Sequence, residues 1–210
     1  ASLLAPEVVS AASACVADLT RQLRPGYPEA RLPTRIKLLP AGLMLRFGFA
    51  GVAAPWLLEP HVDAGLASAS ALAVSLHELA HSAGFASEAT AEAVGMVAGL
   101  ECADRRVRYA AALRLASNVA AALPSEARAQ YVASWPRQAL MDSRAAERAQ
   151  ARFATSPLAP GAEAMYDLYL RSQGESAGLG EYDRGTELAW QLYAARNLLD
   201  RNGELLPTLP

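Results

Sequence analysis

One short stretch of the sequence carries the residue types of a metal-dependent hydrolase. His77, Glu78 and His81 form the pattern HExxH. If the stretch is helical, residues four apart lie on one face, so His77 and His81 can offer two ring nitrogens to one zinc ion. Glu78 then lies beside the metal, where it can act as general base toward a zinc-activated water and return the proton to a leaving amine. The pattern predicts a zinc-dependent peptidase.

A third protein ligand must come from outside this pattern. The chain has three histidines, and the remaining one, His61, lies upstream. The nearest downstream oxygen ligands are Glu88 and Glu92. Gly84 can end the motif helix, and Ser87 followed by Glu88 is typical of the start of a second helix that folds back over the first. We therefore expect Glu88 to be the third metal ligand, with water in the fourth position.

Glu92 is expected to support the site without binding the metal. It follows Glu88 by four residues, so both carboxylates lie on the same helix face. From there Glu92 can accept the second ring proton of a ligating histidine, which fixes the tautomer and orientation of that ligand. Glu59, which precedes the motif helix, can hold a metal-site residue or cap a helix, and the sequence does not separate these roles.

The same residues also allow a site without a metal, because a five-residue pattern with three fixed positions also occurs by chance. The flanks 69–76 and 91–100 are apolar, free of proline and compatible with helix. Burying two histidines and two glutamates between such flanks without a metal would leave polar groups that are costly to satisfy. A metal site is therefore favoured over solvated or mutually paired side chains.

A peptidase also needs a hydrogen-bond donor for the oxyanion. His61, Tyr109 and Tyr182 are the candidates. Each has a structural alternative. His61 can be a metal ligand or a hydrogen-bonded loop histidine, Tyr109 can belong to the core of an apolar helix, and Tyr182 can close a glycine-rich turn. The sequence leaves the choice among the three open.

Length and composition point to one helical domain. At 210 residues the chain is long enough to bury a sizeable core. Alanine, leucine and arginine dominate, which favours helices. The net charge of -2 gives no electrostatic case for nucleic acid or an anionic membrane surface as a partner. The expected partner is a peptide or protein substrate.

No apolar run reaches the roughly eighteen residues that a membrane helix requires. The longest run, 41–58, is interrupted by arginine, glycine and proline. We therefore expect the chain to be soluble. It begins with alanine, which we interpret as the mark of a processed or trimmed product, with any membrane anchor outside it.

Cys15 and Cys102 are the only cysteines of the chain. Their separation matches no zinc-binding spacing. They are either two buried free thiols or, in an oxidising compartment, a disulfide. The sequence does not decide between these states.

We predict a mainly α fold of the α+β class, built as a single domain. Its parts are an N-terminal helix and loop (1–32), a small strand region (33–63), a helical body (64–201) and a loose tail (202–210). Short apolar runs between proline and glycine residues predict a meander of two or three strands within 35–58. An edge strand there can line a cleft and pair with an extended peptide.

Apolar periodicity and helix start and stop signals locate the helices. Pro6 begins the first helix, which runs to about residue 24. The helical body is expected to contain helices over 68–84, 88–101, 104–123, 125–135, 136–154, 162–173 and 183–201. The helix over 136–154 is rich in arginine, and its charges are more typical of a solvated face than of a binding patch.

Several of these motifs occur in a specific order. Residues 77–88 read HELAHSAGFASE, residues 33–63 contain a succession of Pro, Lys and Gly-x-x-Gly that ends at Asp63, Arg108-Tyr109 follows the helix pair, and residues 166–182 read YDLYLRSQGESAGLGEY. In this order they resemble an uncharacterised bacterial family known as domain of unknown function 3810. The resemblance covers about three quarters of the chain.

The resemblance implies membership of the gluzincins, the thermolysin-like clan of zinc metallopeptidases with a glutamate ligand. It implies a zincin-like helical domain with small edge strands before the HExxH helix. His77, His81 and Glu88 are then the zinc ligands, and Glu78 is the general base. Members usually carry N-terminal membrane helices, which implies a place on the extracytoplasmic face of the bacterial membrane or in the periplasm.

The chain departs from the family pattern at three places. Residues 88–92 read EATAE where the family commonly has EDEAN. Asp63 stands where the family has asparagine, and Ser82-Ala83 replace a polar pair. These departures keep the ligand set intact and bear on substrate preference.

Two other functions remain open. The first is a non-catalytic binding or scaffold domain stabilised by a metal, which predicts a closed site with four protein ligands. The second is a zinc hydrolase of a non-peptide amide. A peptide-binding edge strand would argue against the second.

Overall fold

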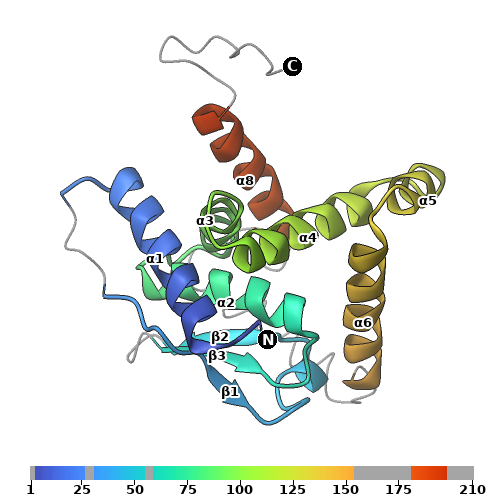
Figure 1. Ribbon diagram of the computed structural model, residues 1–210, viewed down its shortest axis with the longest axis horizontal. Helices are drawn as coiled ribbons and strands as arrows, with labels where there is room; N and C mark the ends of the chain where they lie inside the picture. Colours follow the sequence, from blue (N-terminus) through green and yellow to red (C-terminus); the bar gives the residue numbers. More distant parts are fainter. Residues whose placement is uncertain (1–2, 27–30, 55–58, 154–180, 198–210) are drawn as a thin grey trace.

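The computed structural model describes residues 3–26, 31–54, 59–153 and 181–197 (Figure 1). The described part is mainly helical with one small sheet, so the predicted α+β class is confirmed. In chain order its elements are α1 (Pro6–Leu23), β1 (Lys37–Leu39), the 3-10 turn η1 (Leu45–Phe47), β2 (Gly51–Ala54), β3 (Glu59–Asp63), α2 (Ser68–Ser82), α3 (Glu88–Leu100), α4 (Arg105–Ala122), α5 (Ser125–Ala133), α6 (Arg137–Phe153) and α8 (Glu181–Asn197). The predicted helix over 162–173 and the predicted tail over 202–210 lie outside the described residues.

Helix α3 lies at the centre of the helical body, in contact with α1, α2, α4 and α8 (Figure 1). Nearly all of its residues are buried, including Val94 and Val97 in the middle of the helix. A helix that is apolar on all sides must be covered on all sides. The same apolar cluster contains Val16 of α1 and Leu76 of α2.

The sheet has the strand order β1-β3-β2, so β3 is its central strand. β1 pairs with β3 in parallel, and β2 pairs with β3 in the antiparallel sense. This order differs from the predicted meander, in which consecutive strands would be neighbours. The presence of short strands in this region is confirmed, whereas the predicted topology is wrong.

Asp63, at the end of β3, explains the strand order. Its side chain is fully buried and accepts hydrogen bonds from the backbone N–H groups of Gly42, Met44, Leu45 and Gly65 at 2.7–3.2 Å. Burial raises the pKa of Asp63, but these four donors together lower it below its ordinary value. The carboxylate thereby holds the loop between β1 and β2 at the end of β3, so that β2 enters the sheet on the far side of the central strand.

The turn between α2 and α3 follows the predicted signals closely. Helix α2 ends at Ser82, and Gly84 adopts the left-handed conformation with φ 92°. Its N–H donates to the carbonyl of His81 at 2.9 Å, which is a common way to end a helix. Ser87 then caps α3 by accepting a hydrogen bond from the N–H of Thr90. α3 therefore begins at Glu88 and packs back against α2.

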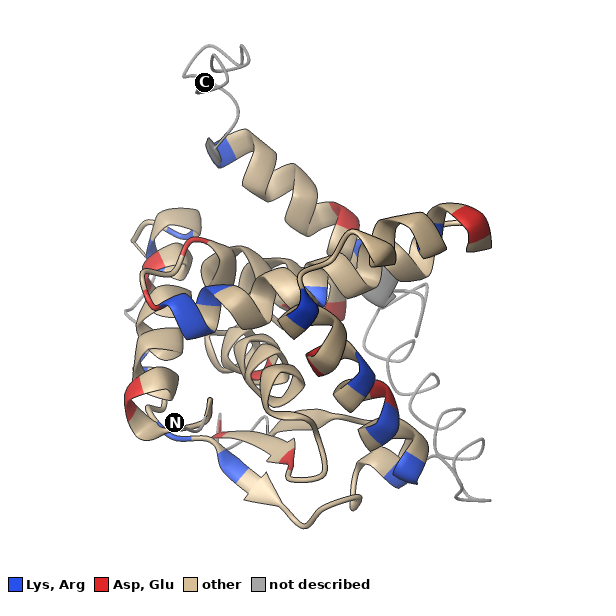
Figure 2. Cartoon of the chain, turned by 45° about the vertical axis from the view of Figure 1, so that its right-hand side comes forward, with Lys and Arg blue, Asp and Glu red and all other residues tan. Residues whose placement is uncertain are grey.

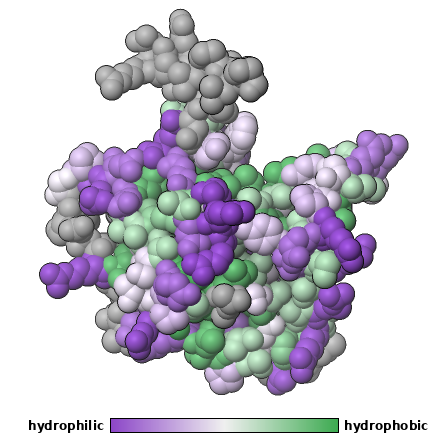
Figure 3. Space-filling view, viewed as in Figure 1, coloured by the Kyte–Doolittle hydropathy of each residue, from purple (hydrophilic) through white to green (hydrophobic). Residues whose placement is uncertain are grey.

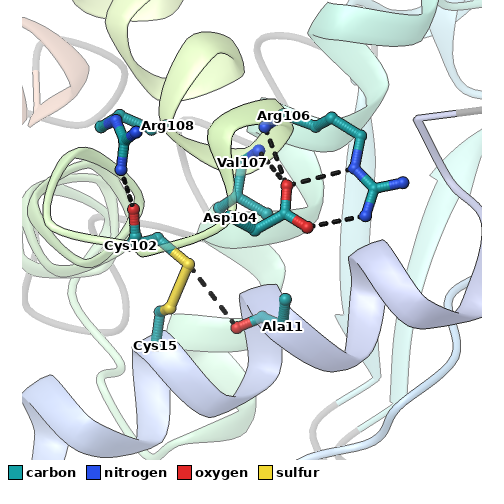
Figure 4. The surroundings of a disulfide bond; sticks show 7 residues. All are labelled: Ala11, Cys15, Cys102, Asp104, Arg106, Val107 and Arg108. Atoms are coloured by element: carbon teal, nitrogen blue, oxygen red, sulfur yellow. Dashed lines mark hydrogen bonds and ion pairs between the residues drawn. A yellow bond between two sulfur atoms is a disulfide. The ribbon is translucent and has the colours of Figure 1, made fainter.

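Cys15 and Cys102 form a disulfide, so the alternative of two free thiols does not hold (Figure 4). The bond joins α1 to the turn between α3 and α4, across 87 positions of the sequence. In the same turn, the guanidinium of Arg108 donates to the carbonyl of Cys102 at 2.6 Å. A disulfide that closes a long loop stabilises a domain by about 2–4 kcal/mol, largely by restricting the unfolded chain.

Most charged side chains of the described residues lie at the surface, with Asp63, Glu78, Glu88 and Glu92 as buried exceptions. Hydrophilic residues are spread over the face shown in Figure 3. Figure 2 marks the arginines along α6 in blue. Their side chains are all exposed, consistent with a solvated face. In the described segments of the chain, no helix combines the length and the apolar character that crossing a membrane requires.

Candidate metal centre

Three side chains from α2 and α3 converge on one point. His77 and His81 lie one turn apart on α2, and their Nε2 atoms are 3.1 Å from each other. Glu88, in the first turn of α3, places one carboxylate oxygen 3.1 Å from His77 Nε2 and the other 3.5 Å from His81 Nε2. Together these residues could hold a metal ion. His77 and Glu88 are buried, and His81 is partly open to solvent.

The spacing of these donor atoms fits a single ion. A tetrahedral ion with bonds of about 2.0–2.1 Å separates its ligand atoms by about 3.3 Å. The two ring nitrogens are 3.1 Å apart, and the two nitrogen–oxygen distances, 3.1 and 3.5 Å, involve different oxygens of the Glu88 carboxylate, so all three are near that value. Two imidazoles and a carboxylate are also ligand types that divalent transition metals accept. The structure therefore brings together the three predicted ligands, His77, His81 and Glu88, in a geometry that suits them.

The other ring nitrogen of each histidine already has an acceptor. Nδ1 of His77 lies 3.1 Å from a carboxylate oxygen of Glu92, and Nδ1 of His81 lies 2.8 Å from the carbonyl oxygen of Phe85. Each Nδ1 can donate its proton there, which leaves both Nε2 atoms to face the point between the ligands. Glu92 therefore occupies the position that its spacing from Glu88 predicts.

Without a metal, the ionisable side chains of this site strongly affect one another's pKa values. Burial lowers the pKa of His77, but hydrogen bonds to Glu88 and Glu92 and the nearby charge of Glu78 raise it to about 10. Burial raises the pKa of Glu92, but Arg114 and His77 lower it to about 2. The two histidines likewise lower the pKa of Glu88 against the effect of burial. A proton on His77 thus supplies part of the positive charge that the buried carboxylates require.

Glu78 lies between the ligand group and the sheet. It is only 5 % exposed, and its burial raises its pKa despite the opposing effect of His77 and His81. On its other side is strand β2. A Cβ atom added at Gly51 would lie 2.8 Å from the Glu78 carboxylate, and the backbone N–H of Ala53 also interacts with it. The predicted general base therefore lies close to the candidate ligands and contacts the edge of the sheet.

Close packing of α3 on α2 positions Glu88 and Glu92. A Cβ atom added at Gly95 would lie 2.7 Å from the carbonyl oxygen of Leu76 and 3.0 Å from the backbone nitrogen of His77. Only glycine allows the two backbones to approach so closely. This role was not predicted from the sequence, although Glu88, Glu92 and Gly95 follow one another at intervals of four and three, which places them on one helix face.

Helix α4 contributes two further residues that the sequence analysis missed. Arg114 donates through Nε to the second carboxylate oxygen of Glu92 at 3.0 Å, and Asn118 approaches the same oxygen at 3.4 Å. Asn118 also donates to the hydroxyl of Thr186 in α8 at 2.8 Å. Arg114 and Asn118 are four residues apart, so they lie on one face of α4. Their partners come from distant segments, which no local pattern indicates.

His61 is not brought to the metal ligands. It pairs with Val52 across β2 and β3, whereas Gly51 pairs with Val62. Gly51 faces α2 and Glu78, and side chains alternate along a strand, so Val52 and His61 lie on the opposite face of the sheet. Nδ1 of His61 lies 2.9 Å from the carbonyl oxygen of Glu59. His61 is thus a hydrogen-bonded histidine, as the alternative to a site role predicted, but it lies on strand β3 and not in a loop.

The remaining candidates also have other surroundings. The hydroxyl of Tyr109 donates to Asp142 of α6 at 2.6 Å, and its ring packs in a small apolar cluster around Ala69. Burial and Asp142 raise the pKa of Tyr109. The carboxylate of Glu59 pairs with Lys37 on the sheet. The side chain of Tyr182 lies outside the described residues.

A comparison with protein families supports the resemblance noted in the sequence. The model of the family described as "Protein of unknown function (DUF3810)" matches residues 6–190. The chain belongs to this family. The match spans all the residues of the candidate metal centre and helices α2 and α3, which carry the candidate ligands. Neither a curated protein nor a solved structure matched the chain.

The raised pKa of His77 predicts a metal affinity that depends on pH. Below about pH 10 the metal-free protein keeps a proton on His77, and a divalent metal ion that binds its Nε2 must displace that proton. The affinity should therefore rise about tenfold per pH unit between roughly pH 7 and pH 9, where one proton is released for each ion bound. Competition titrations against a chelator of known affinity measure this slope. An affinity independent of pH in this range would contradict the protonated state of His77.

Replacing Gly95 by alanine should separate α3 from α2 and weaken metal binding. The added methyl group meets backbone atoms that cannot turn away, at a cost of about 1–3 kcal/mol in unfolding free energy. Because Glu88 and Glu92 move with α3, we expect the metal affinity to fall about tenfold or more. Urea unfolding and a metal titration measure the two effects.

Gly99→Ala is the matched control for Gly95→Ala. Its methyl group would meet side-chain atoms of Ala111 and Leu76, at 2.6 and 2.7 Å, one turn farther from the ligands. This variant should lose stability but keep most of its metal affinity. Equal metal affinities in the two variants would show that the contact at Gly95 does not position the ligands.

Proposed function

We propose that this protein is a zinc-dependent peptidase of the gluzincin type. The observation that carries the proposal is the convergence of His77, His81 and Glu88, with a buried carboxylate, Glu78, beside them. Two histidines and one carboxylate with a further position left for water form a common catalytic zinc set. Zinc is the ion proposed because it accepts this donor set with tetrahedral geometry.

Glu78 has the properties of a general base for this reaction. When bound, zinc supplies a Lewis acid that polarises a carbonyl group and makes a water molecule more acidic. Glu78 is close enough to both histidines for their charges to affect its pKa, which supports a place beside the same water. Burial raises its pKa above that of an ordinary glutamate, which is the direction in which a catalytic carboxylate is tuned. The same carboxyl group can then protonate the leaving amine.

The edge strand β2 supports a peptide substrate. Ala53 is paired with Pro60, which has no N–H group, so these two residues cannot exchange backbone hydrogen bonds. The N–H and C=O groups of Ala53 therefore point away from β3, toward the side of β2 where Glu78 lies, and the N–H interacts with the Glu78 carboxylate. The hydrogen bond from Asp63 N–H to the Ala50 carbonyl, at 3.0 Å, agrees with this alternation. An extended peptide can add to such an edge, beside Glu78.

The alternatives fit these observations less well. A structural metal site is closed by four protein ligands, whereas the group among the described residues contains three. A hydrolase of a small non-peptide amide has no use for a strand edge beside the general base. We therefore favour a peptide or protein substrate over either alternative.

We also propose that the domain works outside the cytoplasm, on the outer face of the bacterial membrane or in the periplasm. The support is the Cys15–Cys102 disulfide. Disulfides persist mainly in oxidising compartments, and the periplasm is one of them.

Two glutamine variants separate metal binding from catalysis. Glu88→Gln removes a charged ligand, so its zinc content should fall well below one ion per chain. Glu78→Gln should keep its zinc but lose peptide cleavage by about 100-fold or more, because the general base is gone. Elemental analysis measures zinc, and digestion of an unfolded protein substrate measures cleavage.

Glu126→Gln provides the matched control, because Glu126 is exposed on α5. It should retain both zinc and cleavage. Wild-type protein without zinc, or a Glu78→Gln variant with undiminished cleavage, would overturn the proposed function.

A further inference from the structure

Glu92 is held at both ends of its carboxylate. One oxygen lies 3.1 Å from His77 Nδ1, and the other accepts from Arg114 Nε at 3.0 Å. Asn118 adds a longer contact of 3.4 Å to the second oxygen. Glu92 is only 5 % exposed, so it has almost no water to replace these partners. A buried carboxylate that lost one of them would tend to turn toward solvent or another donor.

Helix α8 closes the remaining side of Glu92. A Cβ atom added at Gly185 would lie 2.7 Å from Cβ of Glu92 and 3.2 Å from the carbonyl oxygen of Ala89. The backbone of α8 therefore packs directly on the stem of the Glu92 side chain and restricts its rotamers. The next residue, Thr186, accepts the hydrogen bond from Asn118. α4 and α8 are thus connected to each other at the place where both contact Glu92.

The side chain of Arg114 is well suited to fixing the orientation of the Glu92 carboxylate. Its guanidinium is planar and always charged, so it holds a carboxylate in a fixed orientation. The side chain of Arg114 is 39 % exposed, whereas that of Glu92 is 6 % exposed. The arginine therefore remains largely hydrated while it directs a buried group. Its removal would leave little empty space in the core.

We propose that Arg114 is a positioning residue of the metal centre, assisted by Asn118 and by the packing of α8 at Gly185. It acts through Glu92, which orients the ring of His77, and thereby sets the affinity for the metal. The inference rests on the proposed metal-binding function, and it concerns metal affinity rather than cleavage. It predicts that residues about a hundred positions apart in the sequence control one metal ligand.

Arg114→Met tests this role with zinc and cobalt ions as the probes. Removing a group that orients a metal-binding histidine typically costs 10- to 100-fold in metal affinity. Arg114 contacts Glu92 and not the histidine itself, so we expect its removal to lower the metal affinity by about tenfold. The visible spectrum of the cobalt-loaded protein should change as well, because the ring of His77 is less firmly oriented. Arg114→Lys keeps the charge but lacks the planar guanidinium, so its zinc affinity should lie between those of the wild type and Arg114→Met.

Arg108→Met is the matched control. Arg108 lies on the same helix but donates to the carbonyl of Cys102 and not to Glu92. This variant should lower the melting temperature of the metal-free protein and leave the zinc affinity and the cobalt spectrum unchanged. Asn118→Ala, which removes a weaker contact to Glu92, should lower zinc affinity by a smaller factor than Arg114→Met.

The outcomes separate the two proposals. If the wild type binds one zinc ion and Arg114→Met binds it equally tightly with the same cobalt spectrum, Arg114 is structural only and the inference is overturned. If the wild type binds no zinc at all, the proposed function itself fails. A selective loss in Arg114→Met and Asn118→Ala, with Arg108→Met unaffected, establishes the positioning role.

Discussion

The close contact between α2 and α3 is the constraint on which the candidate site depends. The two histidines belong to α2, and the two carboxylates that contact them belong to α3. Their distances are therefore set by how near the helix backbones come. Gly95 permits this approach, because any side chain there would overlap the backbone at Leu76 and His77. The ligand set is thus a property of a helix pair and not of the HExxH stretch alone.

The buried carboxylates of the candidate site require positive charge nearby. Glu78, Glu88 and Glu92 are all at most 6 % exposed, and uncompensated carboxylates at such depth are unfavourable. Arg114 compensates Glu92 from the rim of the site. In the metal-free chain a proton on His77 provides further positive charge close to the candidate ligands. A divalent cation at the same point would provide more, so the proposed metal would explain how so acidic a group can lie in an apolar core.

Features that depend on interactions between residues close in sequence were predicted, whereas features that depend on distant residues were not. The HExxH helix, the turn at Gly84 and the start of α3 at Ser87 depend on neighbours within a few residues, and their patterns located them correctly. The strand order depends on Asp63 binding a loop some twenty positions away, which no local pattern indicates. The same reason explains why Arg114 was missed and why the face of the sheet that carries His61 could not be predicted.

The disulfide acts on the helix that carries Glu88. Cys102 lies just beyond the end of α3, and Cys15 anchors it to α1. At its other end α3 is fixed by the cap at Ser87 and by the contacts of Glu88 with the histidines. A helix held at both ends has little freedom to slide along α2. Because a shift of α3 would move Glu88 and Glu92 together, the covalent link at one end of the helix favours the ligand geometry at the other.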